Sequence, residues 1–280
     1  MEKNTFGYRP TWAEINLKHI VYNINSIRKI VSKDTRILAT VKADAYGHGI
    51  IPVSKTLVGQ SVDYLGVASI DEAVLLRNSG IKSSILVLGG ILPQDAEAII
   101  RYGLTQTVYT ESVARALNMA AKRANSKARV HIKVDTGMGR LGVWHRDALS
   151  FIDKINNLAF IDMEGVFTHL SSADSDTDFT NEQIAIFDTI LRKLESRGVN
   201  IRLRHAANSA GLIDFKSSHY NLVRPGIIIY GLIPSFGIQV KVKPVLSIKT
   251  KIIYIKKTPK GRSISYGRSF VTKKNTMIAT

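Results

Sequence analysis

The chain lacks several features that would direct a first search for its function. None of its 280 residues is cysteine, which excludes a disulfide framework, a cysteine nucleophile and a thiolate metal site. There is no run of about 18 apolar residues, so no membrane-spanning helix is expected. The opening segment, MEKNTFGYRP, has no apolar core of the kind that a signal peptide needs. Together these absences predict a soluble, cytoplasmic protein.

Acidic residues are missing from the C-terminal quarter. Residues 215–280 hold 13 Lys/Arg and no Asp/Glu, a net charge of +13, whereas residues 1–214 hold 26 Lys/Arg and 22 Asp/Glu, a net charge of +4. Such asymmetry can mark a nucleic-acid or membrane surface. In the stretch VKVKPVLSIKTKIIYIKK, however, basic residues alternate with β-branched ones, which is typical of half-exposed strands. We therefore predict neither nucleic acid nor a membrane as a partner.

Short β-branched runs alternate with helical patterns over most of the chain. The first helix is predicted over 17–31, where apolar residues recur at a helical period. Ser69 and Thr180 each open a Ser/Thr-x-x-Glu/Gln pattern, which predicts a helix starting at each. The predicted strands are 37–42, 64–69, 84–89, 105–109, 129–134, 162–168, 201–205 and 221–224.

Eight strands that mostly alternate with helices fit either an open doubly wound sheet or a (β/α)8 TIM barrel. Eight repeats within about two hundred residues favour the barrel. Past about residue 235 strands follow one another without helices. We predict an α/β protein with a barrel over 12–234 and a mainly β domain formed by 1–11 and 235–280.

Polar residues gather at the predicted C-terminal ends of the strands, where barrels place their chemistry. They are Lys42, Lys133, Asp135, Arg140, His169, His205, Asn208, Ser209 and Arg224. Because cations and hydrogen-bonding groups outnumber acids in this set, an anionic ligand such as a phosphate is expected. Lys42, at the end of a buried strand in TVKADAYGHG, is either a solvated lysine or an amine with a depressed pKa that can form a Schiff base.

Three other patterns carry less weight. GMGRLG at 137–142 matches a dinucleotide fingerprint, but it follows the fifth strand, so we predict that its glycines let a loop place Arg140 over the rim. DSDTD at 174–178 resembles the start of a calcium loop but lacks the later Gly and Glu. His131, His145 and His219 show no metal-ligand spacing, so no metal site is predicted.

The motifs taken in order resemble one family. VKADAYGHG, KVDTGMGRLG, FTHLSSAD, HAANSAG, LVRPGIIIYGL and SYGRSF are similar to the successive motifs of alanine racemases, over about residues 10–280. The resemblance implies a pyridoxal 5'-phosphate enzyme with a (β/α)8 barrel and a C-terminal β domain. It would interconvert L-alanine and D-alanine by a two-base mechanism and supply D-alanine for peptidoglycan.

By this resemblance Lys42 carries the cofactor and acts as one base, and Tyr266, supplied by the second subunit of a homodimer, acts as the other. His169 matches the histidine that hydrogen-bonds the tyrosine, and Arg224 matches the arginine that faces the pyridine nitrogen. The cofactor's phosphate is matched by Tyr46, Asn208, Ser209, Gly226, Ile227 and Tyr230. Arg140 matches a substrate-carboxylate ligand, and Lys133 matches a lysine that can be carbamylated.

The chain departs from the family pattern at its end. Thr280 falls where a further strand of the β domain is expected, so we predict that this second domain is incomplete. Two alternatives therefore stay open beside an active alanine racemase. One is a cofactor-binding barrel with little or no turnover, and the other is a broader amino-acid racemase.

Overall fold

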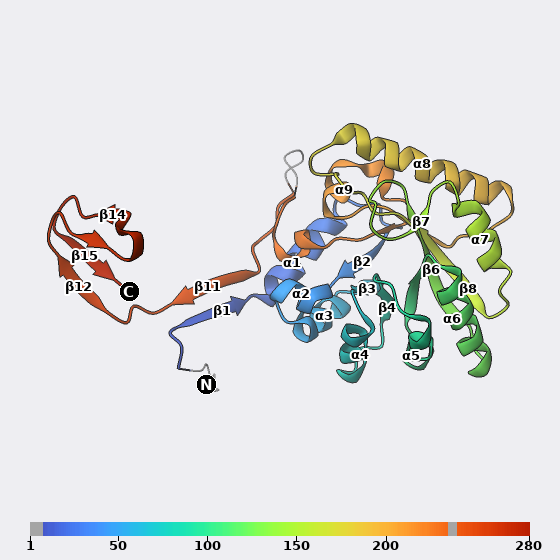
Figure 1. Cartoon of the computed structure of the whole chain (residues 1–280), viewed down its shortest axis with the longest axis horizontal. Coiled ribbons are helices and arrows are strands. Elements are labelled where there is room, and N and C mark those ends of the chain that lie inside the picture. The colour runs from blue at the N-terminus through green and yellow to red at the C-terminus, as the bar shows by residue number, and fades with distance from the viewer. Residues whose placement is uncertain (1–7, 235–239) are drawn as a thin grey trace. The chain divides into compact units, whose positions relative to one another are not determined.

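A computed structural model describes residues 8–234 and 240–280 (Figure 1). The chain divides into two units, which are described separately. One is Asn16–Val245, and the other combines residues 8–15 with 246–280. The sequence prediction put these boundaries at 12 and 234. Among the helices of the described residues, none is both long and apolar enough to span a membrane.

The larger unit is the predicted barrel. Its parallel strands are β2 (Arg36–Thr40), β3 (Tyr64–Val67), β4 (Ser84–Val87), β5 (Thr105–Val108), β6 (Ala128–Asp135), β8 (Ile161–Phe167), β9 (Leu203–His205) and β10 (Leu222–Val223). They pair in the order β10-β2-β3-β4-β5-β6-β8-β9. A hydrogen bond from Arg204 N to the Asn221 side chain, 2.8 Å long, links β9 to the segment before β10, so the ring is nearly closed. The short strand β7 (Val143–Trp144) pairs with β6.

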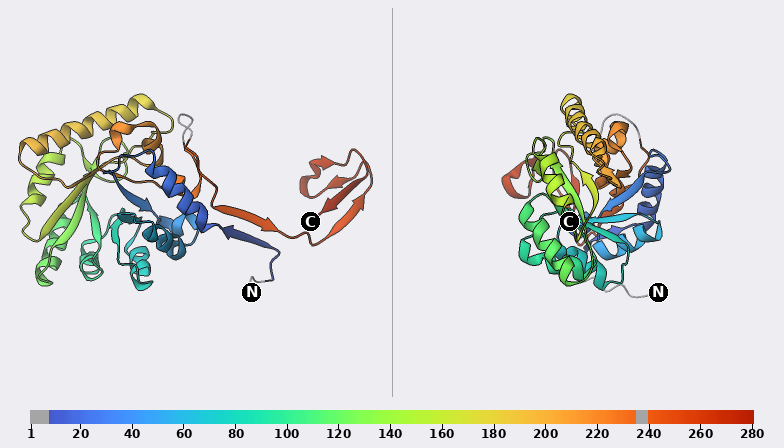
Figure 2. Two further views of the ribbon diagram at one scale, coloured as in Figure 1. Left: turned by 180° about the vertical axis from the view of Figure 1, so that it is seen from behind. Right: turned by 90° about the vertical axis from the view of Figure 1, so that its right-hand side faces the viewer.

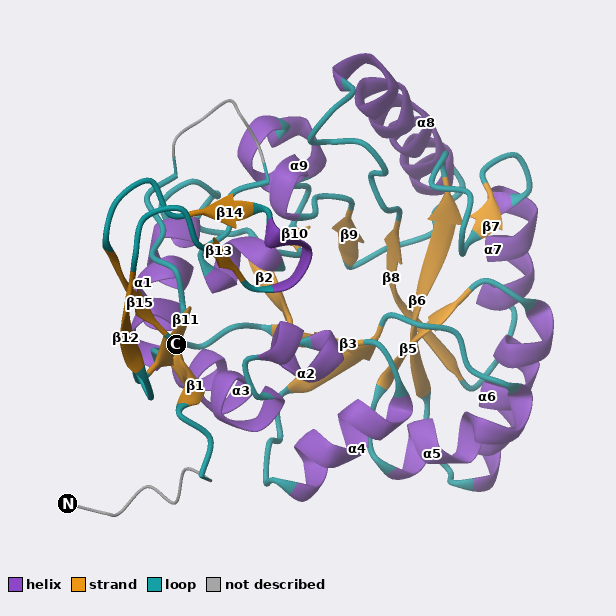
Figure 3. Ribbon diagram, turned by 60° about the vertical axis from the view of Figure 1, so that its left-hand side comes forward, coloured by secondary structure: helices purple, strands orange, loops and turns teal. Residues whose placement is uncertain are grey.

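Helices lie around the outside of this ring (Figure 3). They are α1 (Leu17–Arg28), α3 (Ile50–Gly59), α4 (Ile70–Asn78), α5 (Ala96–Arg101), α6 (Glu111–Arg123), α7 (Ala148–Asn156), α8 (Thr177–Ser196) and α9 (Ser209–Asp214). Helix α8 lies beside α7 (Figure 2) and buries an apolar stripe that includes Ile184, Phe187 and Leu194. Inside the ring, Leu38, Leu86, Leu203 and Leu222 form an apolar cluster with Tyr64.

One of the two predicted helix starts is confirmed. The Ser69 hydroxyl accepts a hydrogen bond from Glu72 N and caps α4. The start predicted at Thr180 is wrong, because α8 begins three residues earlier, at Thr177. The carboxylate of Asp176 caps it by accepting from Phe179 N at 3.0 Å, and Asp is as good an N-cap as Ser or Thr.

The smaller unit consists of three antiparallel strand pairs, as the helix-free sequence pattern predicted. Strand β1 (Thr11–Ile15) pairs with β11 (Leu246–Thr250), β12 (Ile255–Thr258) with β15 (Thr276–Ala279), and β13 (Ser263–Ile264) with β14 (Phe270–Val271). A single 3-10 turn, Tyr266–Arg268, connects β13 to β14.

Candidate functional site

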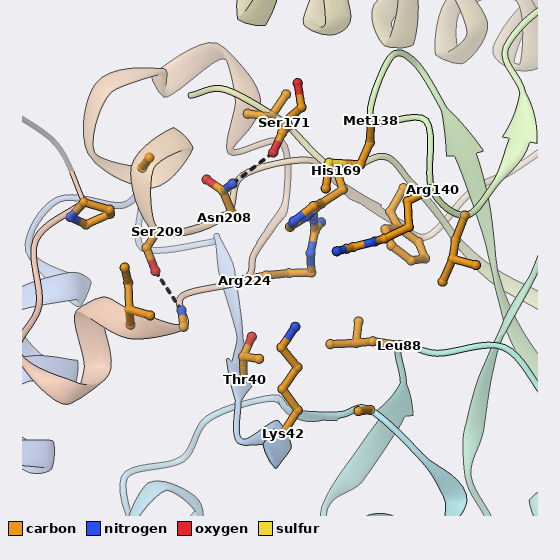
Figure 4. Close-up of a pocket in the computed structure, with 18 of the residues that line it drawn as sticks. Thr40, Lys42, Leu88, Met138, Arg140, His169, Ser171, Asn208, Ser209 and Arg224 are labelled. Atoms are coloured by element: carbon orange, nitrogen blue, oxygen red, sulfur yellow. Dashed lines mark hydrogen bonds between the residues drawn. The ribbon is translucent and has the colours of Figure 1, made fainter. Parts of the chain in front are cut away.

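A cavity of about 400 Å³ opens at the C-terminal ends of the barrel strands (Figure 4). This volume falls in the range of small-molecule sites. Its lining includes ten of the predicted site residues: Lys42, Tyr46, Lys133, Arg140, His169, Asn208, Ser209, Arg224, Gly226 and Ile227. The charged side chains of the lining are four cations, namely Lys42, Lys133, Arg140 and Arg224, and one acid, Asp174. The cavity is therefore suited to a ligand with more than one negative charge.

Lys42 stands at the start of an unusual turn. The segment α2 (Lys42–Gly47) contains four consecutive residues, 43–46, with φ between 52° and 54°, so it is a left-handed helical turn. For residues other than glycine this conformation costs roughly 1–2 kcal/mol each and is concentrated at functional sites. Asp44 stabilises the turn by accepting from Ile50 N at 2.7 Å. Sequence analysis missed it, because only Gly47 and Gly49 hint at positive φ values.

The amine of Lys42 lies near other cations. Burial, and then the positive charge of Arg140, lower the pKa of Lys42, while Glu72 partly opposes the shift. Glu72 also ties the turn to the next βα loop, since its carboxylate accepts from Ala43 N at 2.6 Å and from Ala68 N at 2.7 Å. A lysine in such surroundings is more readily neutral, and therefore nucleophilic, than one in water.

Arg224 is a nearly enclosed cation of the cavity, with 5% of its surface exposed. Its guanidinium donates to Thr168 O at 2.8 Å, to Ala206 O at 2.9 Å and to the Nδ1 atoms of His205 at 2.8 Å and His169 at 3.2 Å. All four acceptors are neutral, because burial and the nearby guanidinium keep the pKa of both histidines well below the usual range. Burial lowers the pKa of Arg224 to about 9, which leaves the guanidinium charged at neutral pH.

One wall of the cavity presents hydrogen-bonding groups without charge. Gly226 N donates to the Ser209 hydroxyl at 2.9 Å, and a Cβ placed on Gly226 would lie 3.1 Å from the Tyr46 hydroxyl. A side chain at 226 would therefore fill the space between these two hydroxyls. Backbone N–H groups and hydroxyls around such a gap are the usual ligands of a phosphate.

Two predicted phosphate ligands have other partners in the structure. Asn208 lines the cavity, but its amide donates to Leu170 O at 3.1 Å and its carbonyl accepts from Gly211 N at 2.9 Å. The Tyr230 hydroxyl donates to Thr40 O at 3.0 Å, and its ring centroid lies 5.2 Å from that of Tyr46. These hydrogen bonds hold both side chains in place at this wall.

The opposite side is formed by strand β6 and the loop after it. The Asp135 carboxylate accepts from Gly137 N at 3.0 Å and Gly139 N at 3.1 Å, and this arrangement shapes the loop that carries Arg140 into the cavity lining. Lys133 is 4% exposed. Burial, followed by the charges of Arg224 and Arg140, lowers the pKa of Lys133 to about 8.

An aromatic ring that sequence analysis missed lies under two of these cations. The Lys133 Nζ atom and the Arg224 Cζ atom lie 5.6 Å and 5.1 Å from the centroid of the Phe167 ring. Cations over an aromatic face are stabilised electrostatically. The available signal was its position two residues before His169, near the end of a predicted strand.

Tyr266 belongs to the smaller unit. It starts the turn between β13 and β14 and is 98% exposed. Ser265, directly before the turn, and Arg268, its last residue, have φ values of 59° and 51°. The phenol is therefore presented on the surface of its unit by a backbone with several left-handed residues.

Comparisons with known proteins point to one family. A family model described as the N-terminal domain of alanine racemase matches residues 15–234, and one described as the C-terminal domain matches residues 245–280. The alanine racemase of Halothermothrix orenii is 46% identical over 275 residues, which are 97% of this chain and 73% of that protein.

Solved structures agree with the sequence relatives. The alanine racemase of Clostridium difficile 630 has a TM-score of 0.90 at 38% identity, covering 99% of this chain and 73% of that one. The alanine racemase of Bacillus anthracis with bound L-Ala-P has a TM-score of 0.86 at 35% identity, covering 98% and 72%.

Proposed function

Because the chain belongs to the alanine racemase family, whose members are isomerases that use pyridoxal 5'-phosphate, we propose that it interconverts L-alanine and D-alanine with Lys42 and Tyr266 as the two bases. The observation that carries the proposal is the position of Lys42. Its amine has a lowered pKa and lies in a cavity with three further cations. The product, D-alanine, would serve peptidoglycan synthesis.

The cavity fits the cofactor. The space that a Cβ on Gly226 would fill, between the Tyr46 and Ser209 hydroxyls, suits the phosphate, with the backbone N–H of Ile227 close by. Asn208 and Tyr230 would hold this wall in place. Arg224 would donate to the pyridine nitrogen, and since a guanidinium has no proton to give up, that nitrogen would stay unprotonated. When bound, the cofactor supplies the electron sink that makes the α-proton of alanine acidic.

The chain's own residues would divide the proton transfers. Arg140 would bind the substrate carboxylate and fix which face of Cα meets each base. Lys42 would take or give the proton on one face and Tyr266 on the other, and a positioned base contributes roughly 10²- to 10⁴-fold to rate. His169 is neutral and accepts from Arg224 at Nδ1, so its proton lies on Nε2 and would be donated to the oxygen of the tyrosine.

Two further parts of the proposal concern Lys133 and a second subunit. A pKa of about 8 leaves a fraction of Lys133 as the free amine that carbamylation requires, and the carbamate would be an anion able to orient Arg140. We propose a homodimer with shared active sites, in which a partner subunit supplies Tyr266. The 98% exposure of that phenol on its own unit supports this arrangement.

The experiment adds pyridoxal 5'-phosphate to the purified chain, records the visible absorption of the covalent adduct and follows L-alanine by polarimetry. We expect an adduct band and loss of optical rotation, both abolished in Lys42→Ala and kept in Lys55→Ala, which alters an exposed lysine of α3. Absence of the band in the unaltered chain would refute the proposal.

A second function is favoured by the division of the residues between units. Every proposed cofactor ligand lies in Asn16–Val245, whereas Tyr266 does not. A band without racemisation would identify a cofactor-binding barrel with little turnover. Racemisation of L-serine at a rate similar to that of L-alanine would identify a broader racemase.

A further inference from the structure

A row of polar side chains leads from the cavity into the barrel interior. From Arg224, the row passes to His205 Nδ1 at 2.8 Å, from His205 Nε2 to His131 Nδ1 at 2.9 Å, and from His131 Nε2 to Glu164 Oε2 at 3.3 Å. Both imidazole rings are fully buried, with 0% exposure. Because barrel interiors are usually filled by branched apolar side chains, this row requires a physical reason.

The backbone is shaped to accommodate the row. Along β6 and β8, Val130 pairs with Met163 and His131 with Gly165, so Glu164 is the extra residue of a β-bulge. Bulges re-aim side chains and are uncommon between parallel strands. A Cβ on Gly165 would lie 2.8 Å from His131 Nδ1, so only glycine leaves room for the imidazole there.

The hydrogen bonds of the row all run in one direction, from the donor Arg224 toward the acceptor Glu164. A guanidinium can only donate, so His205 Nδ1 must be the acceptor and the ring's proton must sit on Nε2. That proton is donated to His131 Nδ1, which puts the proton of His131 on Nε2, facing the Glu164 carboxylate. Arg224, which must donate, and Glu164, which must accept, therefore both require that each ring carries its proton on Nε2.

The charges at the two ends complement each other. Arg224 contacts only neutral acceptors, and no carboxylate within the described residues forms an ion pair with it. Glu164 also accepts from the Tyr64 hydroxyl, has Arg202 Nη2 at 3.8 Å and feels the charge of Arg129. Burial by itself would raise the pKa of Glu164, but hydrogen bonds from His131 and Tyr64 outweigh it and hold the pKa at about 2.

We propose that Glu164 and His131 are positioning residues for Arg224, holding both imidazoles as Nε2–H tautomers so that the His205 lone pair faces the guanidinium. The carboxylate polarises the two rings and so strengthens the hydrogen bond that orients Arg224. The role of Arg224 toward a pyridine ring rests on the function proposed above, whereas the tautomers do not.

The first test uses the unloaded chain, labelled with nitrogen-15 at its seven histidines. Nitrogen–proton correlation spectra distinguish the two neutral tautomers from the imidazolium. We expect His131 and His205 to be Nε2–H tautomers between pH 5 and 9. An Nδ1–H tautomer or an imidazolium at either position would overturn the proposal.

The second test removes the negative charge but keeps an acceptor. In Glu164→Gln we expect the Nε2–H proton resonance to shift upfield at His131 and, through it, at His205. The matched control is Asp162→Asn, two residues earlier on β8, where the carboxylate binds Arg202 and not a histidine. A shift at His131 that fails to reach His205 would show that the row is not coupled.

The third test measures the Kd for pyridoxal 5'-phosphate. We expect Glu164→Gln to raise it about fivefold, which corresponds to about 1 kcal/mol at 1.36 kcal/mol per decade, with Asp162→Asn unchanged. An unchanged Kd in Glu164→Gln would overturn the positioning role alone. Failure of the unaltered chain to bind the cofactor would instead refute the proposed function, while the spectra of the unloaded chain still decide the tautomers.

Discussion

The two units of the chain differ in how they are stabilised. In Asn16–Val245, side chains such as Ile24, Leu65 and Phe187 have 0% exposure and form a core of their own. Within residues 8–15 and 246–280, no hydrophobic side chain is buried, and Thr258 and Thr272 are the buried residues. Strand pairing is therefore present in both units, whereas apolar burial, the main source of folding free energy, is found in the larger unit.

The two units also differ in their acidic residues and ion pairs. The barrel unit contains surface pairs such as Arg202–Asp162 and Arg197–Asp153. Residues 246–280 contain no acid, and the ion pair of the smaller unit is made by Glu14 on β1 with Lys249 on β11, at 2.5 Å. Exposed apolar residues such as Ile253 (68%) and Met277 (57%) belong to the same unit.

The largest expected effect separates catalysis from cofactor binding. Tyr266→Phe should lower the racemisation rate by roughly 10²- to 10⁴-fold, about 3–5 kcal/mol of barrier, because it removes one of the two proposed bases. The cofactor band should be unchanged, because the proposed cofactor ligands lie in the other unit. Polarimetry and visible spectra on the same sample measure both, and a lost band would contradict this division of labour.

The second effect compares a buried phenylalanine of the larger unit with an exposed one of the smaller unit. Phe187→Ala removes a fully buried ring from α8 and should reduce the free energy of unfolding by about 3–5 kcal/mol. Phe270→Ala, at a 54% exposed position of β14, should change it by less than about 0.5 kcal/mol. Urea denaturation followed by circular dichroism measures both. Similar losses would mean that the smaller unit also has a core.

The third effect compares two carboxylates at low pH. The pKa of Glu164 is about 2 in the folded chain, below the ordinary 4.5, so its contribution to stability is present above about pH 4.5 and is lost as pH falls toward 2. Glu164→Gln should therefore lose on the order of 1–3 kcal/mol at pH 7 and show a flatter stability profile below pH 4.5. Glu14→Gln, which alters the exposed pair with Lys249, should hardly change the profile. Denaturation at several pH values tests this, and parallel profiles for the unaltered chain and Glu164→Gln would contradict it.

The smallest effect probes the wall of the cavity. Ser209→Ala removes the acceptor of Gly226 N and one proposed phosphate ligand, so the Kd for pyridoxal 5'-phosphate should rise about tenfold, the effect of one hydrogen bond of roughly 1–1.5 kcal/mol. Ser269→Ala, at an exposed serine of the smaller unit, is the matched control and should leave the Kd unchanged. Equal changes in the two variants would mean that Ser209 does not contact the ligand.

The order of strands and helices was predictable because each depends on residues close in sequence. Hydrophobic periodicity located the barrel strands to within a few residues. The strand predicted to reach Lys42 ends at Thr40, since the chain turns into a left-handed helical segment that periodicity does not report. The gathering of Lys42, Arg140 and Arg224 at one rim also followed, because parallel strands in a barrel end on the same side.

The sequence by itself determined the alternation of elements, the absence of thiol chemistry and the cations at the strand ends, since all of these are properties of short segments. Only the tertiary structure decided that His205, His131 and Glu164 form one directed row behind Arg224. That row depends on a bulge and on a glycine at 165 that leaves room for a ring from the neighbouring strand. Contacts of this kind join residues far apart in sequence, so the energy that selects them exists only once the barrel has formed.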